Sequence, residues 1–192
     1  FRRVLFRSRW EKVRFADLLE MIAERFPQTR FRFLTSHPIL FSTRILEVVA
    51  KFPNLLPFFH LPAQSGSNRI LSLMKRGYTR DSYLELVRKI RSLVPGATLS
   101  TDMICGFPTE TEEDFEDSLN LLREVRYETG FLFYYSERKG TDAAAMEGGV
   151  ELSLRKDRLA RMIEVQRQIQ SEIYTGMVGS DRKSTRLNSS HQ

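Results

Sequence analysis

Residues 97–115, with the sequence ATLSTDMICGFPTETEEDF, decide the fold class. Ala97 to Ile104 is an apolar segment of strand length, and Cys105 to Pro108 contains the glycine and proline that typically follow a strand. Thr111 is followed three residues later by Asp114, a pairing that resembles a capping box and predicts the start of a helix. A strand, a loop and a helix in this order form the unit from which α/β folds are built.

The same unit repeats on both sides of this stretch. Further strands are predicted at residues 30–34, 58–61 and 131–135. Apolar spacing predicts a helix ending near Phe26, one capped by Ser42, a short one over 70–74, one capped by Thr79 and a last one through Leu159 and Ile173. Four strands alternating with helices indicate parallel βαβ units. Ligands bind at the loops after the carboxyl ends of such strands, which here begin near Thr35, Gln64, Gly106 and Ser136.

The composition excludes several classes of protein. The chain has 192 residues, 41% of them hydrophobic and 28% charged, as in ordinary folded domains. No apolar run approaches the roughly 18 residues that a membrane span needs, so a transmembrane segment is excluded. The single cysteine, Cys105, excludes a disulfide framework and a cysteine-rich metal site, and we expect it to be buried and inert. The net charge of +6 ordinarily suggests nucleic acid or a membrane surface as a partner.

The two ends of the chain differ from this pattern. Residues 1–8 (FRRVLFRS) and 181–192 (DRKSTRLNSSHQ) lack helical or strand periodicity. One short DNA element, read in opposite orientations, can encode both ends, and it resembles a sequencing-library adapter. We therefore expect residues 1–8 and 180–192 to be adapter-derived and residues 9–179 to form the domain. A basic N-terminal arm and a polar C-terminal tail are the alternative explanation of the two ends. Residues 1–8 carry a net charge of +3 and residues 181–192 carry +2, so only +1 of the +6 lies between them.

Two of the expected exit loops carry polar groups suited to ligand binding. The loop of Gln64, Ser65, Gly66 and Ser67 offers an amide, two hydroxyls and a glycine ahead of a helix, which suits a carboxylate or a ribose. Helix capping by Ser67 explains the same loop equally well. Asp102 lies within an apolar strand, where an unpaired carboxylate is costly. Either a ligand hydroxyl or a backbone N–H would satisfy it.

The histidines and the basic turns also admit two explanations. His37 and His60 each stand at a strand end, but no matching Cys, Asp or Glu stands at metal-ligand spacing, so we expect structural or substrate contacts and no metal site. Arg76, and Arg138 with Lys139, lie beside aromatic residues in short basic turns. Such turns suit phosphate and base contacts. A solvated basic turn is the simpler alternative for each.

Five motifs in these loops occur in the order found in one enzyme family. They are TSHP (35–38), HLPAQSGS (60–67), RGYT (76–79), STDMICGFPTETEEDF (100–115) and YSERKGT (135–141). With them, the stretch from about Phe15 to Gly179 resembles the radical-SAM methylthiotransferases, where SAM is S-adenosylmethionine. The histidines of the first two motifs resemble the branch that acts on N6-isopentenyladenosine in tRNA.

The resemblance implies an α/β fold, namely the C-terminal portion of a radical-SAM partial (β/α) barrel. It implies SAM as cofactor, with expected contacts from Gln64, Ser65, Gly66, Ser67, Asp102, Gly106 and Glu110. The expected substrate-binding residues are His37, His60, Arg76, Arg138 and Lys139. The implied partner is the anticodon stem-loop of a tRNA, in the cytoplasm, with neither DNA nor a membrane.

Members of this family add a methylthio group to C2 of the modified adenosine and carry two four-iron four-sulfur clusters. Thiolates hold such clusters, and this chain has only Cys105, so we expect an inactive fragment without cluster ligands. Alternatives are the branch acting on threonylcarbamoyl-adenosine in tRNA, the branch acting on a ribosomal protein, and a non-catalytic SAM- or RNA-binding module. Thr109 and Lys139 depart from the family, which more often has glycine and proline there.

Overall fold

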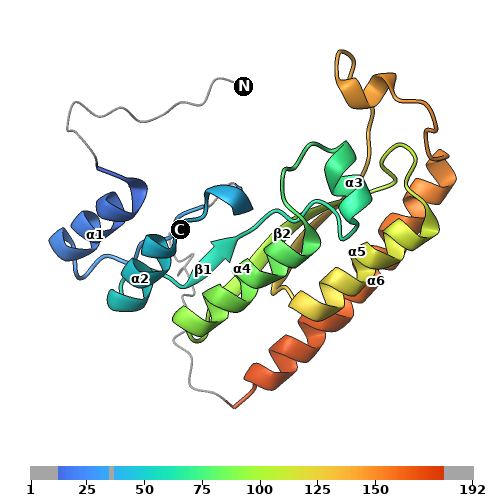
Figure 1. Cartoon of the computed structure of the whole chain (residues 1–192). Coiled ribbons are helices and arrows are strands. Elements are labelled where there is room, and N and C mark those ends of the chain that lie inside the picture. The colour runs from blue at the N-terminus through green and yellow to red at the C-terminus, as the bar shows by residue number, and fades with distance from the viewer. Residues whose placement is uncertain (1–12, 35–36, 180–192) are drawn as a thin grey trace, which may run out of the picture.

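The computed structural model describes residues 13–34 and 37–179, with three strands backed by helices (Figure 1). In chain order the elements are α1 (Phe15–Arg25), the 3-10 helix η1 (Pro38–Leu40), α2 (Thr43–Lys51), β1 (Phe58–His60), α3 (Asn68–Leu73), α4 (Arg80–Leu93), β2 (Thr98–Cys105), α5 (Glu112–Val125), β3 (Thr129–Tyr134), the 3-10 helix η2 (Asp142–Ala145) and α6 (Leu152–Met177). The predicted adapter-derived ends, residues 1–8 and 180–192, lie outside the described residues.

The three strands form a parallel sheet in the order β1-β2-β3, which confirms the α/β prediction. Phe59 of β1 pairs with Leu99 of β2, and Asp102 of β2 pairs with Phe131 of β3. Paired residues of neighbouring strands point to the same side of a sheet, and successive residues alternate. One face therefore carries Phe59 and Leu99, and the opposite face carries Asp102 and Phe131.

Helices cover the first of these faces. In Figure 1, α4, α5 and α6 run alongside one another in front of the sheet. They contribute buried side chains such as Tyr83, Phe115 and Met162 to the core. Full burial of a large apolar side chain stabilises the fold by about 1.5–3 kcal/mol. On the opposite face Phe131 and Phe133 are 50% and 52% exposed, so the sheet is open on that side.

The predicted helix caps are present. Ser42, Thr79 and Thr111 stand directly before α2, α4 and α5, and each side chain accepts a hydrogen bond from a backbone N–H in the first turn. Thr111 and Asp114 form the expected capping box. A cap of this kind contributes about 1 kcal/mol, so these residues determine where the helices begin.

The prediction of a fourth strand at residues 30–34 is wrong. Within that segment only Phe31 pairs, in a single bridge with Leu55. Phe33 is buried and its ring centroid lies 6.0 Å from that of Phe59, so the apolar alternation reflects side-chain packing. Phe31 lies beside the short connection between α2 and β1 rather than beside a strand. The backbone hydrogen bonds that would make a β-ladder therefore do not continue along residues 30–34.

The longest described helix, α6, packs against β3 and α5. Ile169 of this helix is buried. From neighbouring turns, Gln166 and Gln170 donate hydrogen bonds of 2.8 Å each to the carbonyl oxygens of Tyr127 and Glu128. These bonds anchor α6 to the start of β3. Among the described helices, none is both long and apolar enough to cross a membrane.

Candidate functional site

Two adjoining cavities open at the carboxyl ends of the strands, and together we call them the exit cleft. The first has a volume of about 640 Å³ and is lined by Ser72, Leu73, Met74, Lys75, Arg76, Ile104, Phe107, Tyr135, Asp142, Ala143 and Met146. The second has a volume of about 490 Å³ and is lined by Gln64, Asp102, Ile104, Phe133, Tyr134, Tyr135, Ser136, Arg138, Thr141 and Ala143. The cleft occupies the place where parallel α/β folds bind their ligands.

The second cavity holds the polar part of the exit cleft. Asp102 is partly exposed, and its Oδ1 lies 3.5 Å from Nε2 of His60. Nδ1 of His60 lies 2.8 Å from the hydroxyl of Ser100. Gln64 has a φ of 67° and extends the sheet by one bridge to Met103. Two predicted cofactor-binding residues, Gln64 and Asp102, thus border one cavity, with His60 beside Asp102.

The first cavity is mostly apolar. Ile104 and Phe107 come from β2 and the loop after it, and Met146 comes from the segment 136–150 that follows β3. Lys75 Nζ, just after α3, lies 2.5 Å from Asp142 Oδ2 on η2. Because both side chains are exposed, this ion pair contributes little stability. It does place η2 next to the end of α3, at the border of the cavity.

Ser65, Gly66 and Ser67 are buried against α5 and line neither described cavity. The Gly66 N–H donates a hydrogen bond of 2.9 Å to the hydroxyl of Ser118. The Ser67 hydroxyl donates to Asp114 Oδ1 at 2.6 Å, and the same Ser67 caps α3. The capping explanation for this loop is therefore confirmed for Ser67. Direct cofactor contacts by these three residues stay a prediction.

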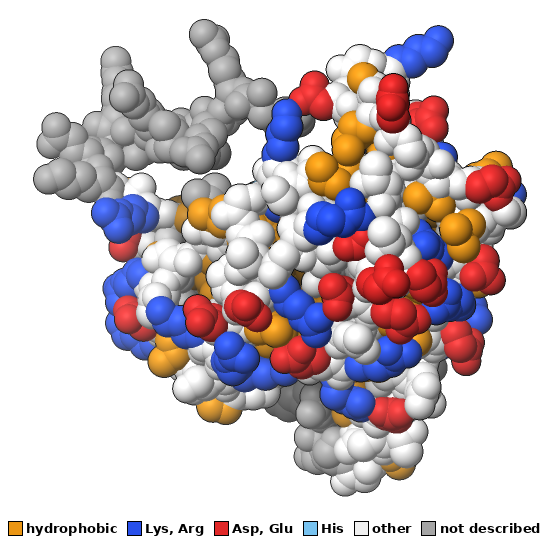
Figure 2. All heavy atoms as spheres, turned by 45° about the vertical axis from the view of Figure 1, so that its right-hand side comes forward, with side chains coloured by type: hydrophobic (Ala, Val, Ile, Leu, Met, Phe, Trp, Pro, Cys, Tyr) orange, Lys and Arg blue, Asp and Glu red, His pale blue; other side chains and the backbone are white. Residues whose placement is uncertain are grey.

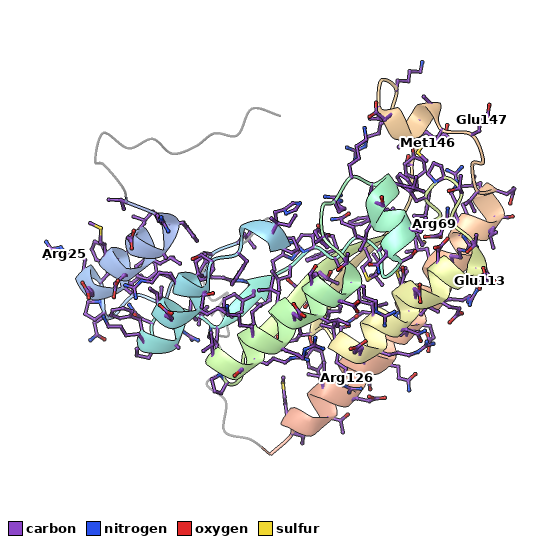
Figure 3. The ribbon with its side chains drawn as sticks, in the orientation of Figure 1. Arg25, Arg69, Glu113, Arg126, Met146 and Glu147 are labelled. Atoms are coloured by element: carbon purple, nitrogen blue, oxygen red, sulfur yellow. The ribbon has the colours of Figure 1, made fainter. Side chains whose placement is uncertain are left out.

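Asp114 connects α3 to α5. Its carboxylate accepts hydrogen bonds from Ser67, from the guanidinium of Arg69 and from both the N–H and the hydroxyl of Thr111. Although burial opposes ionisation, these donors hold the pKa of Asp114 well below its usual range. Figure 3 shows Arg69 at the same end of the fold as Glu113 in the first turn of α5. The start of α5 is thus tied to the loop before α3.

Glu110 also lines neither described cavity, and its side chain is buried. The carboxylate Oε2 accepts from the Gly106 N–H at 2.6 Å and from Nη1 of Arg158 at 2.9 Å. Burial raises the pKa of Glu110 to about 7, while the Gly106 N–H and Arg158 act in the opposite direction. Glu110 and Gly106, both predicted to bind the cofactor, hold the loop after β2 together. Direct contact of either with a cofactor stays a prediction.

The predicted substrate-binding residues divide into two groups. Arg76 borders the first cavity and Arg138 borders the second. His37 and Lys139 border neither cavity. The ring centroid of His37 lies 5.6 Å from that of Tyr78, and Lys139 is exposed in the turn after β3. Of the five predicted substrate-binding residues, Arg76 and Arg138 line the exit cleft directly, and His60 contacts the lining residue Asp102.

Cys105 is buried at the end of β2, as predicted. Burial raises the pKa of its thiol to about 12. Since the thiolate is the form that attacks or binds metals, this thiol is inert at neutral pH. Across residues 13–34 and 37–179, no group of three or more His, Cys, Asp or Glu side chains could hold a metal ion.

Two arginines of α6 support the exit cleft and were not predicted. Arg155 Nη1 donates to the Tyr135 carbonyl at 3.1 Å, and Arg158 holds Glu110. A usable signal was present, because Arg158 lies one helical turn before the apolar Met162 in the predicted last helix. An arginine in phase with an apolar face is seldom buried without a charged partner.

Charges of both signs are interspersed on the face formed by α5 and α6 (Figure 2). Arg158 and Arg161 both pair with Glu112, and Arg161 also pairs with Glu116. Proteins that bind nucleic acid typically present a surface patch of positive charge. The side chains visible in Figure 2 form a mixed surface instead, in agreement with the small net charge expected between the two ends.

Thr109, in the loop after β2, adopts a backbone conformation that is unfavourable for a β-branched residue. Its φ is 65°, in the left-handed region that favours glycine. We expect Thr109→Gly to raise the free energy of unfolding by about 1 kcal/mol in a urea titration. Thr109→Ala is the control, since it removes the same hydroxyl contact with Arg69 but keeps a Cβ. An equal gain in both variants would contradict backbone strain as the cause.

Known proteins resemble the chain at the level of sequence. The profile of the Radical SAM superfamily matches residues 10–122. The tRNA-2-methylthio-N(6)-dimethylallyladenosine synthase of Desulforamulus reducens is 49% identical over 159 residues, which cover 83% of this chain and 35% of that protein. The corresponding synthase of Anoxybacillus flavithermus is 53% identical over 133 residues, covering 69% and 25%. The chain thus spans about a third or less of these relatives.

Two solved structures share the fold. Coproporphyrinogen III oxidase from Escherichia coli, described as a radical SAM enzyme, has a TM-score of 0.63 at 16% identity, covering 79% of this chain and 36% of that protein. Methylornithine synthase has a TM-score of 0.56 at 14% identity, covering 79% and 43%. At these identities the likeness concerns the fold alone, and it confirms the predicted portion of a barrel.

Proposed function

The chain belongs to the radical SAM superfamily, and on this premise we propose that it forms part of the catalytic barrel of a tRNA methylthiotransferase. In this proposal the exit cleft receives the adenosyl part of SAM. The observation that carries it is an apolar and a polar cavity sharing a border at the carboxyl ends of three parallel strands. Relatives such as those of Pelotomaculum thermopropionicum and Anoxybacillus flavithermus, 44% and 53% identical and both tRNA-2-methylthio-N(6)-dimethylallyladenosine synthases, support this class of transferase.

The two cavities suit the two halves of an adenosyl group. An adenine ring is flat, and Ile104, Phe107 and Tyr135 give the first cavity apolar and aromatic surfaces to receive it. Ribose hydroxyls donate hydrogen bonds. The carboxylate of Asp102 and the amide oxygen of Gln64, in the second cavity, are suitable acceptors. We assign the base to the first cavity and the sugar to the second.

Radical SAM chemistry also uses an iron–sulfur cluster, which cysteine thiolates hold. A reduced cluster of this kind would supply the electron that cleaves SAM into methionine and a carbon-centred radical able to abstract a hydrogen atom from the substrate. The residues of this chain do not fit a cluster, since its one cysteine, Cys105, is buried and the pKa of its thiol is raised to about 12. We therefore assign no cluster, and no step of the reaction that needs one, to this chain.

The substrate under this proposal is an N6-isopentenyladenosine beside the anticodon of a cytoplasmic tRNA. Arg138 borders the polar cavity, and the adjacent Lys139 is exposed. Both are positioned for contacts with the phosphates of an RNA strand that approaches the exit cleft. The names of the relatives and the place of Arg138 support this assignment.

Reconstitution with iron and sulfide is expected to leave the chain without a four-iron cluster. A single buried cysteine supplies at most one thiolate, and burial disfavours that thiolate. The measurements are visible absorption and the iron and sulfide content per chain. A protein with a CxxxCxxC loop, treated in parallel, serves as the positive control. A stoichiometric cluster on this chain would contradict the assignment.

Binding of SAM to the chain is expected to be weak, with a dissociation constant on the order of 1 mM. No cluster on this chain chelates the methionine part. Asp102→Ala should weaken binding about tenfold, because a charged hydrogen-bond acceptor is lost from the polar cavity. Asp81→Ala, in the first turn of α4, is the matched control and should bind as the wild type does. The affinities come from titrations followed by NMR.

Equal affinities of the wild type and Asp102→Ala would contradict the place assigned to the ribose. Micromolar binding of SAM, or tight binding of an anticodon stem-loop by the chain alone, would instead support a non-catalytic binding module. Calorimetric titration with the anticodon stem-loop measures whether the chain alone binds RNA tightly.

A further inference from the structure

A buried ion pair joins α6 to the loop after β2. The side chain of Arg158 is 3% exposed, and that of Glu110 is 0% exposed. Arg158 Nη1 donates to Glu110 Oε2 at 2.9 Å and to the Glu110 carbonyl at 3.1 Å. Its Nη2 donates to Glu112 at 3.2 Å. One guanidinium therefore holds the side chain and the backbone at the end of this loop.

The same carboxylate oxygen holds the beginning of the loop. Glu110 Oε2 also accepts from the Gly106 N–H at 2.6 Å, so it lies between that amide and Arg158. Gly106 has a φ of 70°, and the next residue, Phe107, lines the first cavity. Charge-assisted hydrogen bonds of this length are strong and directional. The position of Phe107 at the exit cleft thus depends on a chain of contacts that begins on α6.

A neighbouring arginine supports the other side of the cleft. Arg155 Nη1 donates to the carbonyl of Tyr135, which lines both cavities. A Cβ at Gly106 would lie 2.6 Å from the Cγ of Arg155, so α6 approaches the loop closely only because residue 106 is glycine. The first turns of α6 are therefore in contact with the loops after β2 and β3.

We propose that Arg158 is a positioning residue of the exit cleft: acting through Glu110, it fixes the loop 106–110 after β2 without contacting the ligand. The use of this cleft for an adenosyl group rests on the proposed function. The dependence of the loop on Arg158 rests on the geometry alone.

The charged surroundings of the Glu110 carboxyl are defined by four elements. Arg158 approaches from α6, Asp114 from α5 and Arg69 from α3, and the Cys105 thiol lies at the end of β2. Of these, Arg158 is the cation in direct contact with the carboxylate. Removing its charge therefore changes the ionisation of Glu110 more than any other single substitution in this group.

The amide resonance of Gly106 in the ¹⁵N-labelled chain reports on this network. With Glu110 ionised, the short hydrogen bond to its carboxylate shifts the amide proton downfield, and protonation weakens that bond. In the wild type we expect the Gly106 resonance to titrate with a midpoint near the Glu110 pKa of about 7. In Glu110→Gln the titration should disappear.

Variants of Arg158 test the proposal. Arg158→Met should raise the midpoint of the Gly106 titration and shift the resonances of the loop 106–110. Arg158→Lys, which keeps the charge, should shift the titration midpoint and the loop resonances less than Arg158→Met does. Arg161→Met is the matched control, because Arg161 pairs with Glu112 and Glu116 one turn along the same helix, and it should leave Gly106 unchanged. Circular dichroism checks that each variant folds. If Arg158→Met does not fold, the two single variants Arg158→Lys and Glu110→Gln test the proposal in its place.

The proposal is overturned if the Gly106 resonance does not titrate in the wild type. It is also overturned if that resonance responds to Arg161→Met as much as to a substitution of Arg158. Titration of SAM separates this result from the proposed function. If both hold, the Arg158 variants bind SAM several-fold more weakly than Arg161→Met. If Gly106 responds as expected but SAM affinity is the same in all variants, the positioning is supported and only the assigned ligand is wrong.

Discussion

Gly66→Ala is expected to prevent a stable fold, with a loss of about 3 kcal/mol or more in the free energy of unfolding. A Cβ at Gly66 would lie 2.2 Å from the carbonyl oxygen of Asp117 and 2.7 Å from the Cα of Ser118. These are backbone atoms of α5, which cannot rotate away as the end of a side chain can. The loop before α3 would have to separate from α5, and the Gly66–Ser118 hydrogen bond would break.

Urea unfolding followed by circular dichroism measures this loss. Gly176→Ala is the control, because residue 176 is within α6 and a Cβ there would meet no atom within 4 Å. Alanine favours a helix over glycine by up to about 1 kcal/mol, so this variant should be as stable as the wild type or more so. Wild-type stability in Gly66→Ala would contradict the close approach of the loop to α5.

Asp114→Ala is expected to lower the free energy of unfolding by about 3 kcal/mol near neutral pH. Its side chain is 9% exposed and accepts hydrogen bonds from Ser67, Arg69 and Thr111. Hydrogen bonds to a charged group contribute about 1.5–3 kcal/mol, and the substitution leaves several donors without an acceptor. Asp117→Ala is the control, since that side chain is half-exposed and its pair with Arg80 contributes at most about 0.5 kcal/mol.

The effect of Asp114→Ala should depend on pH. The pKa of Asp114 is lower in the folded chain than in the unfolded chain, where a value of about 3.9 applies. The contribution of the carboxylate is therefore fully present above that unfolded value and is lost as the pH falls through the folded value. The stability difference between wild type and variant should shrink as the pH is lowered from about 6 toward 3. A constant difference would assign the loss to packing alone.

Elements whose signals are local were predictable from the sequence. Thr111 and Asp114 are three residues apart, so their capping box is visible without knowledge of the fold. The strand predicted at 97–104 appears as β2 over Thr98–Cys105. The predicted strand at 30–34 failed because alternation of apolar residues is also produced by packing, as with Phe33 against Phe59.

The candidate site was predictable only in part. Gln64 was expected in the loop after a strand and Asp102 within a strand, and both border the exit cleft. The partner of Arg158 was not predictable, because Glu110 lies 48 positions earlier in the chain, in a loop rather than on the same helix. The need for glycine at position 66 was likewise not predictable, because it comes from the close approach of the α5 backbone. Local patterns carry no information on which distant helix approaches a loop.

The contact between Gly66 and α5 also affects when this region folds during synthesis. The Gly66 N–H finds its acceptor in Ser118, 52 residues later. At ribosomal rates, roughly 3–10 s separate the synthesis of the two residues. For most of that interval the residues of β1 and α3 have already been synthesised, but the loop between them cannot dock on α5. A nascent chain that pauses before Asp114 therefore leaves Ser65, Gly66 and Ser67, which are buried in the finished fold, without their partners on α5 and accessible to chaperones and to other chains.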